Sequence, residues 1–192
     1  MRTLAALMLA ALGALPLAAS AQDVAELTAD TRAKALPVLP KVVGMMQDTV
    51  AAEGVENAIP VCKDKAPLLL KQRAEETGWT LRRVSLKVRN PERGTADLWE
   101  ARHLADFDVR AANGEKPEKL EVGEIVTQPD GKKVFRYLRA VPVGEVCVKC
   151  HGDPAQMPAG LKAKLAESYP KDQATGYRQG QIRGALSVLR PL

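Results

Sequence analysis

Hydrophobic and polar positions follow two different periods along the chain, and this difference separates helical segments from β segments. Helical spacing or composition marks residues 24–35, 41–52, 68–76, 95–109 and 158–168. Strand-like alternation or composition marks residues 79–90, 120–127, 133–143 and 181–189. Apolar residues three to four positions apart predict a helix, whereas strict alternation predicts a half-buried strand. The order of these segments predicts an α+β fold built on one antiparallel sheet.

Proline and glycine residues divide these segments. The sequence Leu-Pro-Val-Leu-Pro at 36–40 must bend or break the first helix, within which Thr28 is a capping candidate. Gly78 ends the third helix. The turn sequence Pro-Asp-Gly at 129–131 lies between two strand-forming segments and therefore predicts an antiparallel hairpin.

A Cys-x-x-Cys-His motif directly follows this hairpin, at residues 147–151. Cys147 and Cys150 have the spacing at which two thiols form thioethers to the vinyl groups of a c-type haem, and His151 is then the proximal iron ligand. Two other interpretations remain: a closed Cys₃His zinc site completed by Cys62, or a chance match. The compartment in which the protein works helps to separate them.

The N-terminus has the features of an export signal. Met1-Arg2 is followed by an apolar stretch over residues 4–17 and by the small residues Ala-Ser-Ala at 19–21. We therefore expect residues 1–21 to be cleaved, residues 22–192 to form a single domain, and the product to be periplasmic. No later stretch is apolar for long enough to cross a membrane. Covalent haem attachment takes place outside the bacterial cytoplasm, so export favours haem over zinc.

Three cysteines leave one over when two of them form thioethers, and that one is Cys62. Asn57 is a candidate N-cap and Pro60 fits a first helical turn, which places Cys62 near the start of a helix. The helix dipole together with Lys63 and Lys65 would then stabilise a thiolate, the form that binds iron. A buried, inert thiol is the alternative.

Other side chains that could bind iron are few. His103 is the only histidine besides His151, and it lies at the edge of the apolar stripe of its helix, where we expect a surface or supporting role. Met45 and Met46 point about 100° apart on a helix, so at most one could face an iron, and core packing is the expected role for both. Met157 is only six residues after His151, too close to reach the opposite haem face easily.

The strand over residues 79–90 alternates apolar and basic side chains. Its basic positions include Arg83, Lys87 and Arg89. This row could hold haem propionates, bidentately in the case of the arginines, or it could form a solvated face, and the pattern leaves both open. The formal net charge of +5 falls to about +4 without the leader, which is weak evidence for a nucleic-acid partner, and we expect none.

The position of the motif argues against a small all-helical cytochrome c. In that fold the haem motif lies near the N-terminus with a methionine ligand far downstream, whereas only 41 residues follow His151 here. Aromatic residues make up 4% of the chain, so a haem could supply much of the flat apolar surface of the core.

Four segments in a fixed order resemble a known family. They are Ala58-Ile59-(Pro60-Val61)-Cys62, residues 83–91 with Trp99-Glu100 after them, the motif at 147–151, and Ala174-Thr175-Gly176-Tyr177 leading to residues 184–188. This combination resembles the PAS-like c-type haem domains of cyanobacteria and proteobacteria, long catalogued as a domain of unknown function. The resemblance covers nearly all of the chain after residue 21.

The resemblance implies a PAS-like antiparallel sheet flanked by helices, one covalent haem c, and an axial pair formed by His151 and Cys62. It implies a redox sensor or a sensor of a diatomic gas. Because the chain ends at Leu192 without an output domain, sensing would require a separate signalling partner, and a low-potential electron-transfer cytochrome with a redox partner is the alternative. A peroxidase-like enzyme is less well supported, since only His103 is an evident acid/base candidate.

Overall fold

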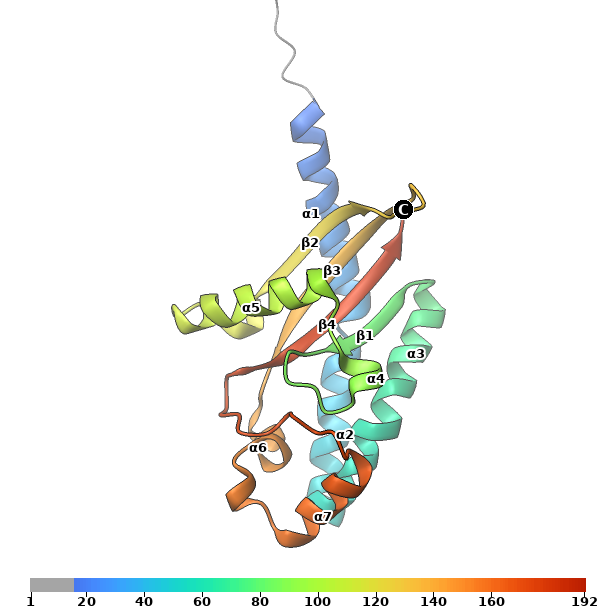
Figure 1. Ribbon diagram of the computed structural model, residues 1–192. Helices are drawn as coiled ribbons and strands as arrows, with labels where there is room; N and C mark the ends of the chain where they lie inside the picture. The colour runs from blue at the N-terminus through green and yellow to red at the C-terminus, as the bar shows by residue number, and fades with distance from the viewer. Residues whose placement is uncertain (1–15) are drawn as a thin grey trace, which may run out of the picture.

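The computed structural model describes residues 16–192, with side chains from Asp23 onward, as a four-stranded antiparallel sheet with helices on both faces (Figure 1). The strands are β1 (Thr80–Val84), β2 (Glu121–Thr127), β3 (Lys133–Pro142) and β4 (Ile182–Pro191). Their order in the sheet is β1-β4-β3-β2, so the last strand of the chain lies in the interior of the sheet. The predicted α+β class is confirmed.

One face of the sheet packs on three helices from the first part of the chain: α1 (Pro16–Ala35), α2 (Val38–Glu53) and α3 (Ala66–Thr77). The predicted break falls at 36–37, and α2 begins earlier than expected because Pro40 occupies its first turn, where no backbone donor is required. Thr28 lies inside α1 and its hydroxyl donates to the Val24 carbonyl, so its assignment as a cap is wrong.

The opposite face packs on α5 (Leu98–Ala112), which follows the short helix α4 (Pro91–Gly94). Asp97 and Glu100 form a reciprocal capping box at the start of α5, which satisfies two backbone donors that the first turn would otherwise leave free. The core on this face contains Leu104 and Phe107 from α5. A 3₁₀ turn, η3 (Pro117–Lys119), leads from this helix to β2.

The hairpin and the closing strand form as predicted. β2 and β3 pair in register from Glu121 with Arg139 to Thr127 with Lys133, and Gly131 in the connecting turn has the positive φ of 82° that this position requires. β4 pairs with β3 on one side and with β1 on the other, which explains why its residues from Gly184 to Val188 are all buried.

The strand predicted over residues 79–90 is shorter in the structure. β1 ends at Val84, and the chain turns because the Ser85 N–H donates to the Gly94 carbonyl instead of continuing the ladder. The alternation therefore does not continue to its end: Leu86 is exposed, whereas Arg89, expected on a polar face, is buried. The basic residues predicted to share one strand face therefore lie in different environments.

The remaining elements form the lower part of the molecule in Figure 1. They are η1 (Val55–Ala58), the π-helical turn η2 (Val61–Lys65), α6 (Glu145–His151), η4 (Pro154–Gln156) and α7 (Ala159–Ser168). A small separate core of Ile59, Met157, Leu161, Leu165 and Tyr169 holds them together. The predicted helix at 158–168 is thus confirmed.

The predicted leader lies largely outside the described residues, since the description begins at residue 16. Between residues 16 and 192, no helix combines the length and the apolar character needed to cross a lipid bilayer.

Candidate functional site

The Cys-x-x-Cys-His motif forms the short helix α6, so Cys147 and Cys150 lie about one turn apart on it. Both are free thiols and half-buried. The helix is anchored at both ends by the backbone: the Val143 N–H donates to the Gln181 carbonyl before it, and the Gly176 N–H donates to the Gly152 carbonyl after it. The closing segment of the chain therefore holds the motif.

His151 is oriented by the same segment. Its Nδ1 lies 2.7 Å from the Ala174 carbonyl oxygen, and its own carbonyl accepts a hydrogen bond from the Tyr177 N–H at 2.9 Å. Burial, with Arg89 and Arg183 nearby, holds the pKa of the imidazole well below its usual range, so the ring is neutral.

The tautomer of His151 follows from its neighbours. Arg183 Nε lies 3.1 Å from the same Nδ1, but an unprotonated Nδ1 would direct its lone pair at the Ala174 oxygen at 2.7 Å. We therefore assign the proton to Nδ1, where it donates to that carbonyl. The Nε2 lone pair is then free for a metal, and a ring nitrogen held by a backbone carbonyl in this way is typical of metal-ligating histidines.

Cys62 lies in the π-helical turn η2, between η1 and α3. Such turns are rare and frequently occur at functional sites. The structure brings Cys62 close enough to the motif for the charges of Cys147 and Cys150 to interact with it, although Cys147 is 85 residues downstream. The N-cap assigned to Asn57 is wrong, because its side chain donates to the Glu53 carbonyl instead.

The thiol of Cys62 is not stabilised as an anion in the way the sequence predicted. Although the residue keeps an exposed surface, burial against the surrounding protein raises the pKa of its thiol, and Arg89, Arg83 and Arg183 only partly oppose this effect. Burial also raises the pKa of Cys150, to about 11. The prediction of a thiolate favoured by Lys63 and Lys65 is therefore wrong, because the loss of solvation outweighs the nearby charges.

Arg89 is a structural clamp on the motif. Its Nε donates to Asp172 at 2.9 Å, and its Nη2 donates to the Cys150 carbonyl at 2.6 Å. Both side chains of this ion pair are nearly buried. The guanidinium is thus committed to protein groups that join α6 to the loop before Ala174.

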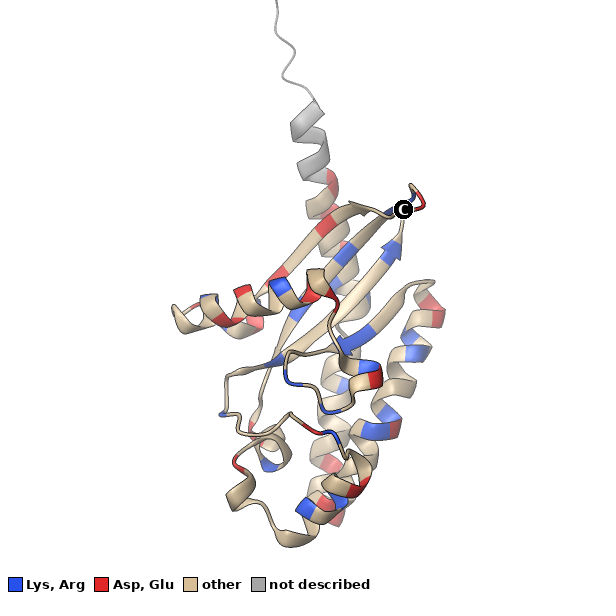
Figure 2. Cartoon of the chain, in the orientation of Figure 1, with Lys and Arg blue, Asp and Glu red and all other residues tan. Residues whose placement is uncertain are grey.

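Arg83 is the opposite case. Its Nε is buried and has no hydrogen-bond partner among the described residues. Burial and the neighbouring Arg183 lower its pKa to about 10, while Cys62 and Cys147 act in the other direction. A buried cation without a counter-charge is costly, so this arrangement fits an anionic group beside Arg83. Figure 2 shows the basic residues of β1 at the end of the strand near α4.

The predicted row of cations therefore separates into different roles. Lys87 donates to the Thr175 carbonyl at 2.5 Å and lies 4.5 Å from the centre of the Tyr177 ring, away from any ion pair. Arg183, which the sequence analysis missed, also joins the group around Cys62, and its Nη1 donates to Ser85 Oγ at 2.9 Å. A charged residue near the start of a predicted strand that is mostly apolar up to Leu189 was the signal that could have identified it.

The other candidate ligands lie elsewhere. His103 pairs with Glu124 at 3.2 Å and contacts Trp99 edge to face, on the α5 face of the sheet. Met157 is part of the small lower core. Met45 and Met46 are half-buried on α2 and belong to none of the three hydrophobic clusters of the described residues.

The zinc interpretation and the haem interpretation can be compared on this geometry. Within residues 16–192, no three histidine, cysteine or acidic side chains come close enough together to hold a metal ion, which argues against a closed Cys₃His site. The residues fit a c-type haem better: two thiols one turn apart, a neutral histidine with a free Nε2, and an unpartnered buried arginine for a carboxylate.

Comparison with known proteins gives a matching family and a solved structure with a similar fold. Residues 16–191 match the model of the Tll0287-like family. The structure is similar to the crystal structure of the cyanobacterial haem protein Tll0287, with 22% sequence identity and a TM-score of 0.63, over 84% of this chain and 95% of that one. None of the curated proteins matches this chain.

Proposed function

Because the chain belongs to the Tll0287-like family, we propose that it is an exported, PAS-like haem protein that carries one c-type haem and acts as a redox sensor or a sensor of a diatomic gas. The observation that carries this proposal is the convergence of Cys62 and the Arg83 guanidinium on the Cys147–His151 helix. The haem would supply an iron that changes between the ferric and ferrous states.

Cys147 and Cys150 would hold the haem covalently. Each thiol adds across one vinyl double bond: the sulfur forms the new C–S bond, and the thiol hydrogen ends on the other vinyl carbon, so no external oxidant is required. His151 would bind the iron through Nε2, since Nδ1 is held by the Ala174 carbonyl. Cys62 would supply the second axial ligand as a thiolate.

The propionates would be held by Arg83, with Arg183 beside it. The buried Arg83 Nε finds no hydrogen-bond partner among the described side chains and backbone, whereas Arg89 and Lys87 already donate to protein groups. Of the three cations expected to bind propionates, the proposal therefore keeps Arg83 in that role and gives Arg89 and Lys87 the role of supporting the segment around His151.

The π-helical turn that carries Cys62 fits a sensor better than a simple electron carrier, because an irregular turn can rearrange when a ligand is released. Burial raises the pKa of its thiol, so the sulfur takes up a proton readily whenever it is not held as a thiolate. Release of Cys62 would free the π turn Val61–Lys65, a local irregularity between two helical elements that can change its hydrogen bonding. A signalling partner protein would read this change.

Peroxidase-like chemistry has less support. The evident acid/base candidate, His103, is paired with Glu124 and packed on Trp99, on the face of the sheet away from the α1–α3 helices.

Substitution of Cys62 tests the proposed ligand. We expect Cys62→Ser to change the optical and electron-spin spectra of the ferric protein, because a hydroxyl replaces the thiolate. Lys63→Ala, an exposed neighbour in the same turn, is the matched control and should leave both spectra unchanged. Unchanged ferric spectra in Cys62→Ser would eliminate Cys62 as the ligand.

Mass spectrometry under denaturing conditions tests the attachment itself. After expression with a haem-maturation system, the wild-type chain should retain the mass of one haem, and Cys147→Ser/Cys150→Ser should lose it. A wild-type chain without haem would refute the proposal. Carbon monoxide binding to the reduced protein then separates the two functions, since an electron carrier would keep both ligands and bind none.

A further inference from the structure

The segment from Ala174 to Tyr177, singled out in the sequence, contacts His151 at both of its ends. The Ala174 carbonyl oxygen lies 2.7 Å from His151 Nδ1, and the Tyr177 N–H donates to the His151 carbonyl at 2.9 Å. Between them, Gly176 has a φ of 74°, a conformation that favours glycine, and its N–H donates to the Gly152 carbonyl. These contacts give a role to the backbone of the segment, and the Tyr177 side chain has contacts of its own.

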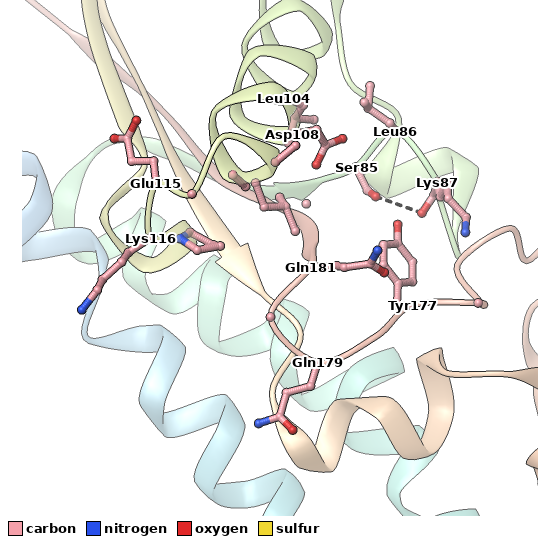
Figure 3. Close-up of a pocket in the computed structure, with 18 residues that line it drawn as sticks. Ser85, Leu86, Lys87, Leu104, Asp108, Glu115, Lys116, Tyr177, Gln179 and Gln181 are labelled. Carbon is pink, nitrogen blue, oxygen red and sulfur yellow. Dashed lines mark hydrogen bonds between the residues drawn. The ribbon is translucent and has the colours of Figure 1, made fainter.

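The Tyr177 ring packs against His151 and against two cations. Its centre is 6.4 Å from the centre of the imidazole, and the two rings meet edge to face. Lys87 Nζ lies 4.5 Å from the ring centre, and the central carbon of the Arg183 guanidinium lies 5.6 Å from it. In Figure 3 the ring stands beside Ser85 and Lys87 in the wall of a hollow of about 730 Å³, which His151 does not line. The ring is thus in contact both with the imidazole and with the arginine next to it.

Arg183 and the Ala174 carbonyl compete for the same nitrogen of His151. Arg183 Nε lies 3.1 Å from Nδ1, on which the Ala174 oxygen also converges at 2.7 Å. A neutral imidazole carries one proton on its two nitrogens, so Nδ1 can satisfy only one of these partners. A proton on Nδ1 satisfies the carbonyl and leaves the Nε2 lone pair free for a metal. A proton on Nε2 lets Nδ1 accept from Arg183 and closes Nε2 to a metal.

The position of the Arg183 guanidinium therefore determines which tautomer of His151 is favoured. Two neutral groups accept hydrogen bonds from its Nη1: Ser85 Oγ at 2.9 Å and the Lys87 carbonyl at 3.2 Å. The Tyr177 ring is a third neutral partner, since the negative face of an aromatic ring attracts a guanidinium within about 6 Å. A guanidinium held by these three groups does not require a hydrogen bond to Nδ1.

We propose that Tyr177 is a positioning residue for His151: its ring holds the Arg183 guanidinium back from Nδ1, which keeps the proton on Nδ1 and the lone pair on Nε2. Without the ring, Nδ1 would become the best remaining acceptor for Arg183 Nε, and the proton would move to Nε2. The tautomer is a property of the chain alone, whereas its use in binding iron rests on the proposed haem function.

Nitrogen-15 NMR at pH 7 distinguishes the two tautomers of a neutral imidazole and needs no haem. The full chain with Cys147→Ser/Cys150→Ser is the starting protein, and His103→Gln assigns the signals of His151, because the chain has only two histidines. We expect Nδ1–H to dominate, and Tyr177→Leu to lower the ratio of Nδ1–H to Nε2–H by about tenfold. Tyr177→Phe, the matched control, keeps the ring and should leave the ratio unchanged.

Arg183→Met, added to Tyr177→Leu, separates this mechanism from a general loosening of the site. Methionine cannot donate to Nδ1, so the double variant should regain the Nδ1–H tautomer although the ring is absent. Circular dichroism shows whether each variant is folded. Tyr177→Met, which fills more of the space of the ring, should shift the ratio in the same direction and takes the place of Tyr177→Leu if that variant does not fold.

Four results would overturn the proposal. They are an Nε2–H tautomer in the starting protein, an unchanged ratio in the folded aliphatic variant, a Tyr177→Phe protein that behaves like that variant, and a double variant that stays in the Nε2–H form. A wild-type chain that carries no haem, together with the expected tautomers, would refute only the proposed haem function.

Discussion

Arg82 and Arg83 are neighbours on β1, yet their environments are opposite. Arg82 points to the α5 face, where it donates to Glu100, a carboxylate that also accepts from Ser187 at 2.6 Å and from the Asp97 N–H at 2.8 Å. Arg83 points to the other face, and its buried Nε has no hydrogen-bond partner in the part of the chain that the structure describes. The same residue type on one strand thus has a structural role on one side of the sheet and is a candidate anion-binding residue on the other.

The difference extends beyond these two residues. On strand β2, Glu121 accepts hydrogen bonds from Arg32, Arg139 and Tyr137, so its charge is matched by protein groups. Around the motif helix, Cys62, Cys150 and Arg83 all have pKa values displaced mainly by burial. Charges that the fold does not compensate are found at functional sites more often than elsewhere, which is why we place the cofactor on this side.

The largest expected effect on stability is at Glu100, on the side of the sheet where the charges are paired. Glu100→Ala should lower the free energy of unfolding by about 2–4 kcal/mol, because it leaves Arg82 and the buried Ser187 hydroxyl without their carboxylate and removes the capping box. Urea denaturation measures this. Asp106→Ala, which breaks only the exposed pair with Arg110, should cost about 0.3–0.5 kcal/mol. Equal costs for the two variants would contradict the comparison.

A change of opposite sign in the free energy of unfolding is expected at Arg83, on the side where the charge is unpaired. In the haem-free Cys147→Ser/Cys150→Ser background, Arg83→Met should raise the free energy of unfolding by about 1–3 kcal/mol, because it removes a buried donor that has no partner. In the haem-carrying protein the same substitution should be destabilising, since a propionate loses its cation. Arg82→Met, the matched control, should destabilise both forms. Destabilisation by Arg83→Met in the haem-free background would refute this interpretation.

The smallest effect concerns Glu121 and pH. Burial raises the pKa of its carboxyl, but hydrogen bonds from Arg32, Tyr137 and Arg139 outweigh it, so the folded-state pKa lies below the ordinary 4.5. The stabilisation is therefore complete above pH 4.5 and is lost as the pH falls through the lower folded-state value. Glu121→Gln should cost about 1 kcal/mol at pH 7, measured by urea denaturation, and the difference from wild type should narrow below pH 4.5. A difference independent of pH would contradict this assignment.

The sequence predicted helices, strands and turns correctly where neighbouring residues alone determine them. The hairpin follows from the turn at 129–131, and the helix break follows from Pro37. The end of β1 was not readable, because the Ser85 N–H finds its acceptor on Gly94, a tertiary contact that no periodicity records. For the same reason the alternation that placed Arg83 and Arg89 on one face could not show which of them would be paired.

By itself, the sequence determined most of the elements, the presence of a Cys-x-x-Cys-His motif and the third cysteine left over at position 62, since each depends on residue identity and short spacing. Only the tertiary structure decided that Nδ1 of His151 faces the Ala174 carbonyl, that Arg89 clamps the motif and that the buried Arg83 Nε has no hydrogen-bond partner within residues 23–192. It also decided the sign of the pKa displacement of Cys62. Solvation and pairing depend on which distant segments surround a group, and that information exists only once the chain has folded.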